Sequence, residues 1–321
     1  MMRLTHRMAA LAIPLAVALG AGTSAIAQNV VLAFAGGAGP TGVPAILALE
    51  SLQEQGMTTE VIEFDSPDIL TQALLNGQVQ IAVMGPATLF AADLAGADLQ
   101  MLAKNNQNDY LIISSPDVEQ CSDLHGRTVA YHSTGSSTTS HLMAWLKETC
   151  PEAAPNFIVL SGSANRVAAL LNGQINGTLV RLEDWMAITR GADDRARVLA
   201  MLVESQRELL TGAVVASASR VDADRALLEA FLAELRLQFQ AIYADPIAYS
   251  ARAAEHLPEM DIDSIEAVYS YFAETEMFPI GEELTVESVE ATLRFYEEAE
   301  RIPVGGLAVD QVANFTFADG N

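Results

Sequence analysis

The chain has 321 residues, a formal net charge of −24 and a sequence pI of about 4.4, and half of its residues are hydrophobic. A surface this acidic repels phosphate backbones and anionic membranes, which excludes nucleic acid as the expected partner. The charge of a small ligand stays open, because a local group of backbone amides can hold an anion inside an acidic protein.

The first 27 residues have the pattern of a cleaved secretory signal peptide. A basic start precedes an apolar run from Met8 to about Gly20, and Ala25-Ile26-Ala27 forms a small-residue cleavage site. A membrane anchor is the alternative, but the run is short for a membrane span and contains Pro14. We therefore expect a mature chain that begins at Gln28, resides in the periplasm and is not inserted in the membrane.

Strand and helix patterns alternate along the first two thirds of the chain, which predicts parallel strands joined by crossover helices. Ser66 is a typical N-cap, Pro67 suits the first helical position, and Gly77 suits the left-handed cap that ends the same helix. The elements predicted first along the chain are strand 30–35, helix 42–55, strand 59–64, helix 67–76 and strand 79–84.

The hexapeptide Ala-Leu-Leu-Asn-Gly-Gln occurs twice, at residues 73–78 and 169–174. The surrounding pattern repeats with it, since residues 30–89 align with residues 126–185 without a gap. The elements predicted in the second copy are strand 127–132, helix 137–149, strand 156–160, helix 164–172 and strand 175–180. Two copies of one α/β unit predict two similar lobes with a ligand cleft between them.

The remaining segments are expected to join the lobes and to complete the first one. Residues 110–115 and 211–218 are apolar and β-prone, and we interpret them as two hinge strands. Helices are predicted at 224–243, 246–255, 263–275 and 286–298. The predicted organisation after the signal peptide is a first lobe over 28–110, a second lobe over 111–213, and a return to the first lobe over 214–321.

Cys121 and Cys150 are the only cysteines, and export would permit a disulfide between them. Cys121 precedes the predicted strand 127–132, and Cys150 ends the helix that follows it. Because that helix returns antiparallel to the strand, we expect the two residues to meet in a disulfide, with free buried thiols as the alternative.

Ligands of open parallel sheets bind beyond the carboxyl ends of the strands, and this rule selects the candidate binding residues. The candidates in the first lobe are Gly37, Ala38, Thr41, Ser66, Gly85, Pro86, Ala87 and Thr88. The candidates at the hinge and in the second lobe are Tyr110, Ser133, Thr134, Gly135, Ser136, Ser137, Thr138, Ser163, Arg181, Glu183 and Trp185.

The loop from Ser133 to Thr138 has the strongest anion-binding pattern. Its glycine permits close approach of the backbone, its hydroxyls donate hydrogen bonds, and the following helix directs free amides at it. The alternative is a Ser/Thr-rich N-cap that holds only water. Arg181 is the cation best placed to meet an anion, unless it pairs with Glu183 or Asp184.

Other candidates have equally open alternatives. Arg166 lies in the first turn of a predicted helix and is a second candidate cation for the cleft. Trp185 and Tyr110 either pack against the apolar part of a ligand or belong to the core.

Catalytic and metal-binding patterns are poor, so we expect a binding protein without a cofactor. His132 and His141 flank the Ser/Thr loop, but no carboxylate stands at a spacing typical of a triad. The sequence has no His-rich tract, no Cys-x-x-Cys and no phosphate-binding P-loop.

Five segments of the chain carry a resemblance to a known family, at residues 66–86, 123–130, 137–142, 162–170 and 284–296. In their order and spacing they resemble the periplasmic solute-binding proteins of nitrate/sulfonate/taurine-type ABC importers, a superfamily that includes a thiamine-precursor branch. The resemblance implies an α/β type II periplasmic-binding-protein fold, with two similar lobes joined by two hinge strands. It also implies capture of a small solute and delivery to a membrane permease with its ATPase. We expect the protein to act as a monomer.

Solutes that bear an anion, such as sulfonates or carboxylates, fit the Ser/Thr loop best. One departure from the family pattern is visible at Gln80 and Asn176, where Asp is usual; both lie near strand starts, and we expect the fold to survive. Three other functions share the fold: a binding protein of a TAXI-type tripartite transporter, an exported enzyme that uses His132 or His141 as a base, and a sensor lobe.

Overall fold

The structure is a computed structural model that describes residues 29–35, 38–64, 67–134, 136–189, 194–280 and 284–317. The expected signal peptide and three candidate binding residues, Gly37, Ser66 and Gly135, lie outside these ranges. Within them, no helix has the length and apolar character needed to cross a membrane.

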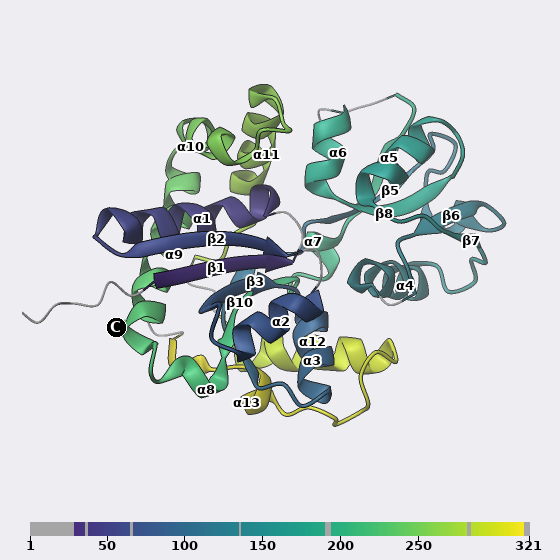
Figure 1. Cartoon of the computed structure of the whole chain (residues 1–321). Coiled ribbons are helices and arrows are strands. Elements are labelled where there is room, and N and C mark those ends of the chain that lie inside the picture. Colours follow the sequence, from purple (N-terminus) through teal and green to yellow (C-terminus); the bar gives the residue numbers. More distant parts are fainter. Residues whose placement is uncertain are drawn as a thin grey trace, which may run out of the picture.

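Two five-stranded sheets form the cores of two lobes, which lie on the left and right of Figure 1. The strands of the first sheet are β1 (Asn29–Ala35), β2 (Thr58–Phe64), β3 (Ile81–Met84), β4 (Leu99–Asn106) and β10 (Gly212–Ser217). Those of the second are β5 (Tyr110–Ser114), β6 (Thr128–Tyr131), β7 (Asn156–Val159), β8 (Gly177–Arg181) and β9 (Arg197–Met201). The orders β2-β1-β3-β10-β4 and β7-β6-β8-β5-β9 are the same arrangement twice, which confirms the two similar α/β lobes predicted from the repeat.

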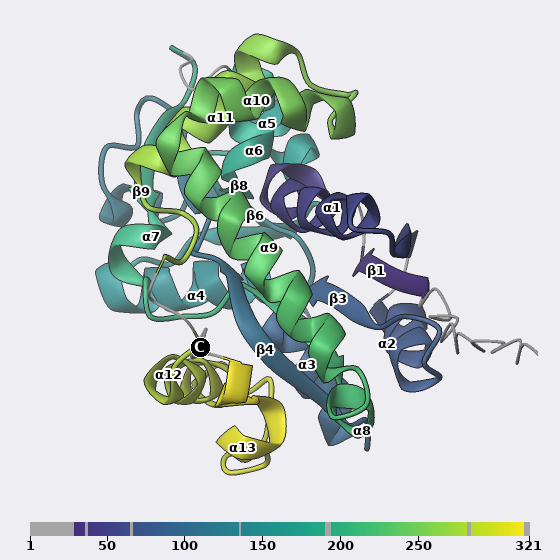
Figure 2. The same cartoon turned by 90° about the vertical axis from the view of Figure 1, so that its left-hand side faces the viewer.

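Helices cover both faces of the first sheet. The helices of this lobe are α1 (Gly39–Glu54), α2 (Pro67–Leu75), α3 (Pro86–Leu94), α8 (Ala218–Val221), α9 (Arg225–Ala244), α10 (Pro246–Ala253), α11 (Ile262–Glu274), α12 (Val286–Glu298) and α13 (Val309–Val312). Short 3-10 turns are η2 (Ala254–His256) and η3 (Phe315–Phe317). Helices α1, α9, α10 and α11 lie on one side of the sheet and α2, α3, α12 and α13 on the other (Figures 1 and 2).

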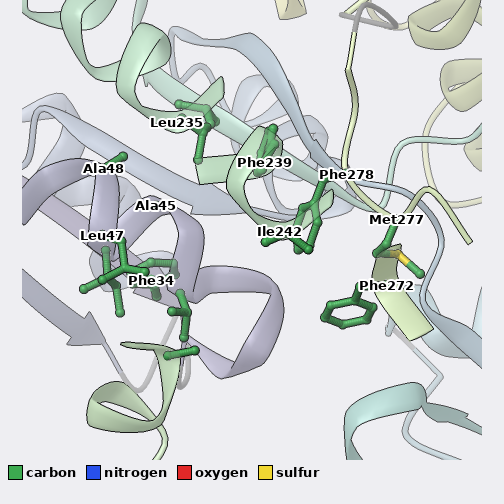
Figure 3. Close-up of a cluster of buried hydrophobic side chains, with 14 of the residues drawn as sticks. Phe34, Ala45, Leu47, Ala48, Leu235, Phe239, Ile242, Phe272, Met277 and Phe278 are labelled. Atoms are coloured by element: carbon green, nitrogen blue, oxygen red, sulfur yellow. The ribbon is translucent and has the colours of Figure 1, made fainter. Parts of the chain in front are cut away.

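The alternation of side chains along β1 fixes these two faces. Val30, Leu32 and Phe34 pack in one cluster with α1 and α9, whereas Val31 and Ala33 pack in another with α2, α3 and α12. Figure 3 shows part of the first cluster, with side chains of α1, α9 and α11 around the end of β1. The first cluster continues into the second lobe, so the lobes share apolar contacts behind the cleft.

The second lobe is smaller and repeats the strand and helix order of the first. Its helices are α4 (Ser137–Thr149), α5 (Ser163–Leu171), α6 (Leu182–Thr189), α7 (Leu202–Ser205) and the 3-10 turn η1 (Cys121–Leu124). The two copies of the hexapeptide end α2 and α5, and their glycines have nearly equal positive φ angles, +70° at Gly77 and +68° at Gly173. Gln80 Oε1 accepts from the amide of Val31, and Asn176 Oδ1 accepts from that of Thr128. These two residues therefore play the same part, holding the start of the neighbouring strand in each lobe.

The expected hinge strands lie inside the sheets and do not cross between the lobes. Residues 110–114 form β5, which pairs antiparallel with β8 and β9, and residues 212–217 form β10, antiparallel to β3 and β4. The chain crosses from one lobe to the other just before each of them, over residues 107–109 and over α7 and the segment that follows it. The apolar, β-prone composition of both segments correctly predicted strands. It reflects their burial inside the sheets and not a passage of the chain between the lobes.

Cys121 and Cys150 form a disulfide at the end of the second lobe away from the first, with their Cα atoms 5.8 Å apart. Cys121 begins η1, just before β6, and Cys150 follows the last residue of α4. The bridge thus ties the end of α4 back to the start of its strand.

Candidate functional site

A small inner cavity of about 120 Å³ lies where the carboxyl ends of the first-lobe strands meet the two chain crossings. Thr41 of α1 and Gly85 after β3 contribute to its wall from the first lobe. Asn105 and Asn106 end β4 beside it, and Tyr110 and Arg181 contribute from the second lobe. The cavity therefore has both lobes in its wall.

Arg181 enters this cavity already paired with two carboxylates. Its Nη1 lies 2.8 Å from Glu183 Oε1, and its Nε lies 3.7 Å from Asp109 Oδ2. Burial raises the pKa of Glu183 to about 7 and also raises the pKa of Asp109, while the guanidinium opposes both shifts. The proposed ion pair with Glu183 is thus formed, and Arg181 is not a free cation waiting for an anion.

A larger outer cavity of about 730 Å³ opens beside the inner one. Helices α2 and α3 form its first-lobe wall, and Ser133, Ser136 and Ser137 line it from the second lobe. Gly85 lines both cavities. Both cavities therefore border the residue that follows β3.

The N-termini of two helices, one from each lobe, border this outer cavity. Helix α3 begins after Gly85, which provides no side-chain cap, and helix α4 begins after Ser136, whose Oγ accepts from the amide of Thr139 at 3.3 Å. Free first-turn amides and the positive ends of helix dipoles favour negatively charged groups. At α3, Pro86 has no N–H and the amide of Thr88 donates to the carbonyl of Gly85, so this helix offers mainly the amide of Ala87 and the end of its dipole. The outer cavity is therefore the part of the cleft suited to an anion.

Hydroxyl groups between the cavities are held by the C-terminal helix. Ser137 Oγ lies 2.6 Å from the hydroxyl of Tyr296 on α12. Burial raises the pKa of Tyr110 to about 12, so its phenol stays protonated and able to donate. Ser137 of the outer cavity and Tyr110 of the inner cavity thus each carry a hydroxyl.

Most of the candidate residues that the structure describes lie at these two cavities. The inner cavity is lined by Ala38, Thr41, Gly85, Tyr110 and Arg181, and the outer cavity by Gly85, Ala87, Thr88, Ser133, Ser136 and Ser137. Glu183 contacts Arg181 as described above. Pro86 is buried at the start of α3, Thr134 is exposed, Thr138 contacts Ser136 Oγ, and Ser163 Oγ accepts from the amide of Arg181. These four residues line neither cavity.

One aromatic candidate, Trp185, and one cationic candidate, Arg166, are buried in the interior. Trp185 is 2 % exposed and packs in the large hydrophobic cluster, which corrects its assignment as a ligand contact. Arg166 is 1 % exposed and donates to the carbonyls of Leu160 and Leu179, so it holds the sheet together and does not point into the cleft. Helical periodicity places both residues on a helix but does not show which face is buried.

His141 is buried between two aromatic rings and lines neither cavity. Its ring stacks on Phe295 at 4.6 Å and meets the edge of Tyr110 at 5.1 Å, and its Nδ1 contacts Gln206 Oε1. Burial lowers its pKa to about 4. His132 receives a hydrogen bond from the amide of Gly162. Neither ring lines the inner or the outer cavity.

The polar run Lys104 to Asp109 was not among the predicted binding residues, yet it supplies Asn105, Asn106 and Asp109 to the inner cavity. Six consecutive polar residues between two apolar strands could have indicated these residues from the sequence. The run has this composition because it contains the first crossing between the lobes.

The comparisons with known proteins agree with this two-lobed arrangement. The family described as NMT1/THI5 like matches residues 51–248 of the chain. No curated protein matches it at a significant level. The relatives below are therefore solved structures only.

Three solved structures illustrate the likeness, each at less than 20 % identity. The periplasmic aliphatic sulphonate-binding protein SsuA of Escherichia coli has 15 % identity and a TM-score of 0.70, over 89 % of this chain and 92 % of that one. The alkanesulfonate-binding protein SsuA of Xanthomonas axonopodis pv. citri, bound to MOPS, has 18 % identity and a TM-score of 0.66, over 88 % and 97 %. The periplasmic nitrate-binding protein NrtA of Synechocystis PCC 6803 has 15 % identity and a TM-score of 0.67, over 91 % and 87 %. These matches confirm the predicted periplasmic-binding-protein fold.

Proposed function

Because the chain belongs to the NMT1/THI5-like family, we propose that it is an exported solute-binding protein that captures a small, anion-bearing solute between its lobes. The observation that carries this proposal is the outer cavity, where the uncapped N-terminus of α3 and the Ser136-capped N-terminus of α4 approach from different lobes. An anion placed between them would interact with both lobes at once. Sulfonates and carboxylates are the expected classes.

Binding would select the closed arrangement of the lobes. A solute that contacts Thr88 in the first lobe and Ser136 in the second makes its full set of contacts only when the lobes are together. The two chain crossings are the segments about which such a closure turns. A membrane permease of an ABC importer would then recognise the closed shape and receive the solute.

The alternative of a tripartite carrier receives no support from the three structural relatives, whose names describe sulfonate-binding and nitrate-binding proteins. We therefore retain the ABC importer as the proposed partner, with the binding protein acting as a monomer in the periplasm.

Two measurements test this function. Protein isolated from the periplasm of an expressing cell should release its solute on denaturation, and mass spectrometry should identify a sulfonate, carboxylate or related anion. Small-angle X-ray scattering should then show a smaller radius of gyration when that solute is added to stripped protein. A bound solute with no anionic group, or tight binding without compaction, would contradict the proposal.

A further inference from the structure

Ser137, the first residue of α4, has its hydroxyl in contact with two buried phenols. Its Oγ lies 2.6 Å from the hydroxyl of Tyr296 on α12, and it also makes a hydrogen bond with Tyr110. Tyr110 and Tyr296 are 8 % and 1 % exposed. Ser137 lines the outer cavity and Tyr110 lines the inner one. A cluster of three hydroxyls therefore lies beside the cleft, with Ser137 at its centre.

The direction of these hydrogen bonds follows from counting protons and acceptors. Burial raises the pKa of both tyrosines, so each phenol keeps its proton at neutral pH. Among the residues that the structure describes, Ser137 Oγ is the only atom in hydrogen-bond contact with either phenol oxygen. A buried O–H without an acceptor is unfavourable, so both phenols donate to Ser137 and occupy its two lone pairs. The proton of Ser137 is then left to donate into the outer cavity.

The contact between Tyr296 and Ser137 also joins the two lobes. Tyr296 packs in the first lobe with β1 and α2, whereas Ser137 begins a helix of the second lobe. A second hydrogen bond joins the same elements one turn further along α4, where Arg301 Nε, just after α12, donates to Ser140 Oγ at 3.0 Å. Separation of the lobes would remove Tyr296 and leave the Ser137 hydroxyl free to rotate. Its proton is therefore directed into the outer cavity only while the lobes are together.

We propose that Tyr296 is a positioning residue for solute binding, which donates to Ser137 and thereby commits the Ser137 hydroxyl to donate to the solute. This inference rests on the proposed function, since the acceptor is the anionic group of a solute in the outer cavity. An oxyanion accepts hydrogen bonds and has none to donate, so it suits a hydroxyl whose lone pairs are occupied. A solute group that must donate would find no free lone pair at Ser137. Because Tyr296 comes from the opposite lobe, recognition of the anion is coupled to closure.

Calorimetry with ethanesulfonate and propanoate, on protein stripped of its solute, tests the inference through a double-mutant cycle. Ser137→Ala removes the donor and should weaken binding of the tighter of these two anions about tenfold, as a hydrogen bond to a charged group implies. Tyr296→Phe keeps the ring but removes the hydroxyl that orients Ser137, and it should weaken binding about fivefold. In the Ser137→Ala background, Tyr296→Phe should change the affinity less than about twofold, because no serine hydroxyl is left to orient.

Ser140→Ala is the matched control, because it removes the other hydrogen bond between α4 and the end of α12, and Ser140 lines neither cavity. It should change the affinity less than about twofold, and thermal unfolding confirms that each variant is folded. An equal loss in Ser140→Ala and Tyr296→Phe would show that Tyr296 only holds the lobes together, which overturns the inference.

Two further results would also overturn it: wild-type affinity in Ser137→Ala, or a loss from Tyr296→Phe that persists in the Ser137→Ala background. Each of these outcomes leaves the anion-binding function intact. Failure of both ethanesulfonate and propanoate to bind the wild-type protein overturns the function and the inference together.

Discussion

The carboxylate of Glu183 in the second lobe lies against the backbone of Gly39 in the first. A Cβ atom placed on Gly39 would lie 2.9 Å from both carboxylate oxygens. Gly39 begins α1, whose N-cap residue Ala38 makes no side-chain capping bond. Glu183 therefore brings negative charge to a helix N-terminus of the other lobe, where such charge is favourable.

Substitution of Gly39 should loosen this contact between the lobes. Gly39→Ala adds a side chain at φ +53°, which costs about 1–2 kcal/mol, and it also displaces the Glu183 carboxylate. We expect a lower midpoint of thermal unfolding and a larger radius of gyration of the ligand-free protein. Gly173→Ala is the control for strain alone, because its φ is +68° and a Cβ there meets nothing within 4 Å. If both variants show the same change in radius, the Glu183 contact does not hold the lobes together.

Removal of the Arg181 guanidinium should destabilise the protein, since it leaves Asp109 and Glu183 facing each other without a cation. For Arg181→Met we expect a loss of about 2 kcal/mol in the free energy of unfolding. This is less than for a fully buried pair, because 41 % of the Arg181 side chain is exposed. Urea denaturation measures it.

A surface pair provides the comparison for Arg181. Arg127 lies 2.8 Å from Asp117, and the two side chains are 42 % and 56 % exposed. Arg127→Met should change the free energy of unfolding by less than about 1 kcal/mol. If Arg181→Met lowers the free energy of unfolding no more than Arg127→Met does, Arg181 does not stabilise the carboxylates of Asp109 and Glu183.

Loss of the disulfide should destabilise the second lobe but leave the binding site intact. The bridge joins residues 29 positions apart, for which the chain-entropy treatment gives about 3–4 kcal/mol. A Cys121→Ser, Cys150→Ser double variant should therefore unfold at lower urea concentration. Solute affinity should stay within about twofold, because the bridge lies at the end of β6 opposite to the cleft. A large loss of affinity in a folded variant would argue against this separation.

His141 should contribute a pH dependence of definite sign. Burial lowers its pKa to about 4, against about 6.5 in an unfolded chain. Between these pH values the unfolded state binds a proton that the native state does not. The contribution of neutral His141 to the free energy of unfolding is therefore fully present above pH 6.5 and is lost as the pH falls towards 4. Asp93 and Glu183 act in the opposite direction, because burial raises the pKa of each to about 7.

A variant separates the effect of His141 from those of the carboxylates. The difference in unfolding free energy between the wild type and His141→Gln should fall by about 3 kcal/mol between pH 6.5 and 4, at about 1.4 kcal/mol per pKa unit. Imidazole resonances, assigned with the same variant, check it directly. A His141 signal that titrates near pH 6.5 would refute the prediction.

Local signals in the sequence were sufficient for much of the fold. Helix α4 has the predicted bounds because Ser136 caps its start, and Gly77 and Gly173 end their helices with positive φ angles, as the repeat indicated. Helix α3 and strand β4 were not predicted. Helix α3 is rich in alanine and strand β4 ends in the polar residues 104–106, so neither has a clear helical or strand period.

The site was only partly predictable for a different reason. The loops after the strands border the two cavities, as the rule for parallel sheets predicts from the order of strands alone. Whether the side chains of Arg166 and Trp185 are buried depends on which face of each helix the sheet covers. The role of the polar residues 104–109 depends on where the chain passes between the lobes. Such properties arise from tertiary packing, which a local pattern does not contain.

The position of β10 also sets the order in which the protein can be assembled. β10 lies between β3 and β4, so the first sheet has a gap at its centre until residues 212–217 have been made and have entered the fold. The second sheet, by contrast, is built from one continuous stretch, residues 110–201. The second sheet can therefore be complete before the first, whose centre is filled last.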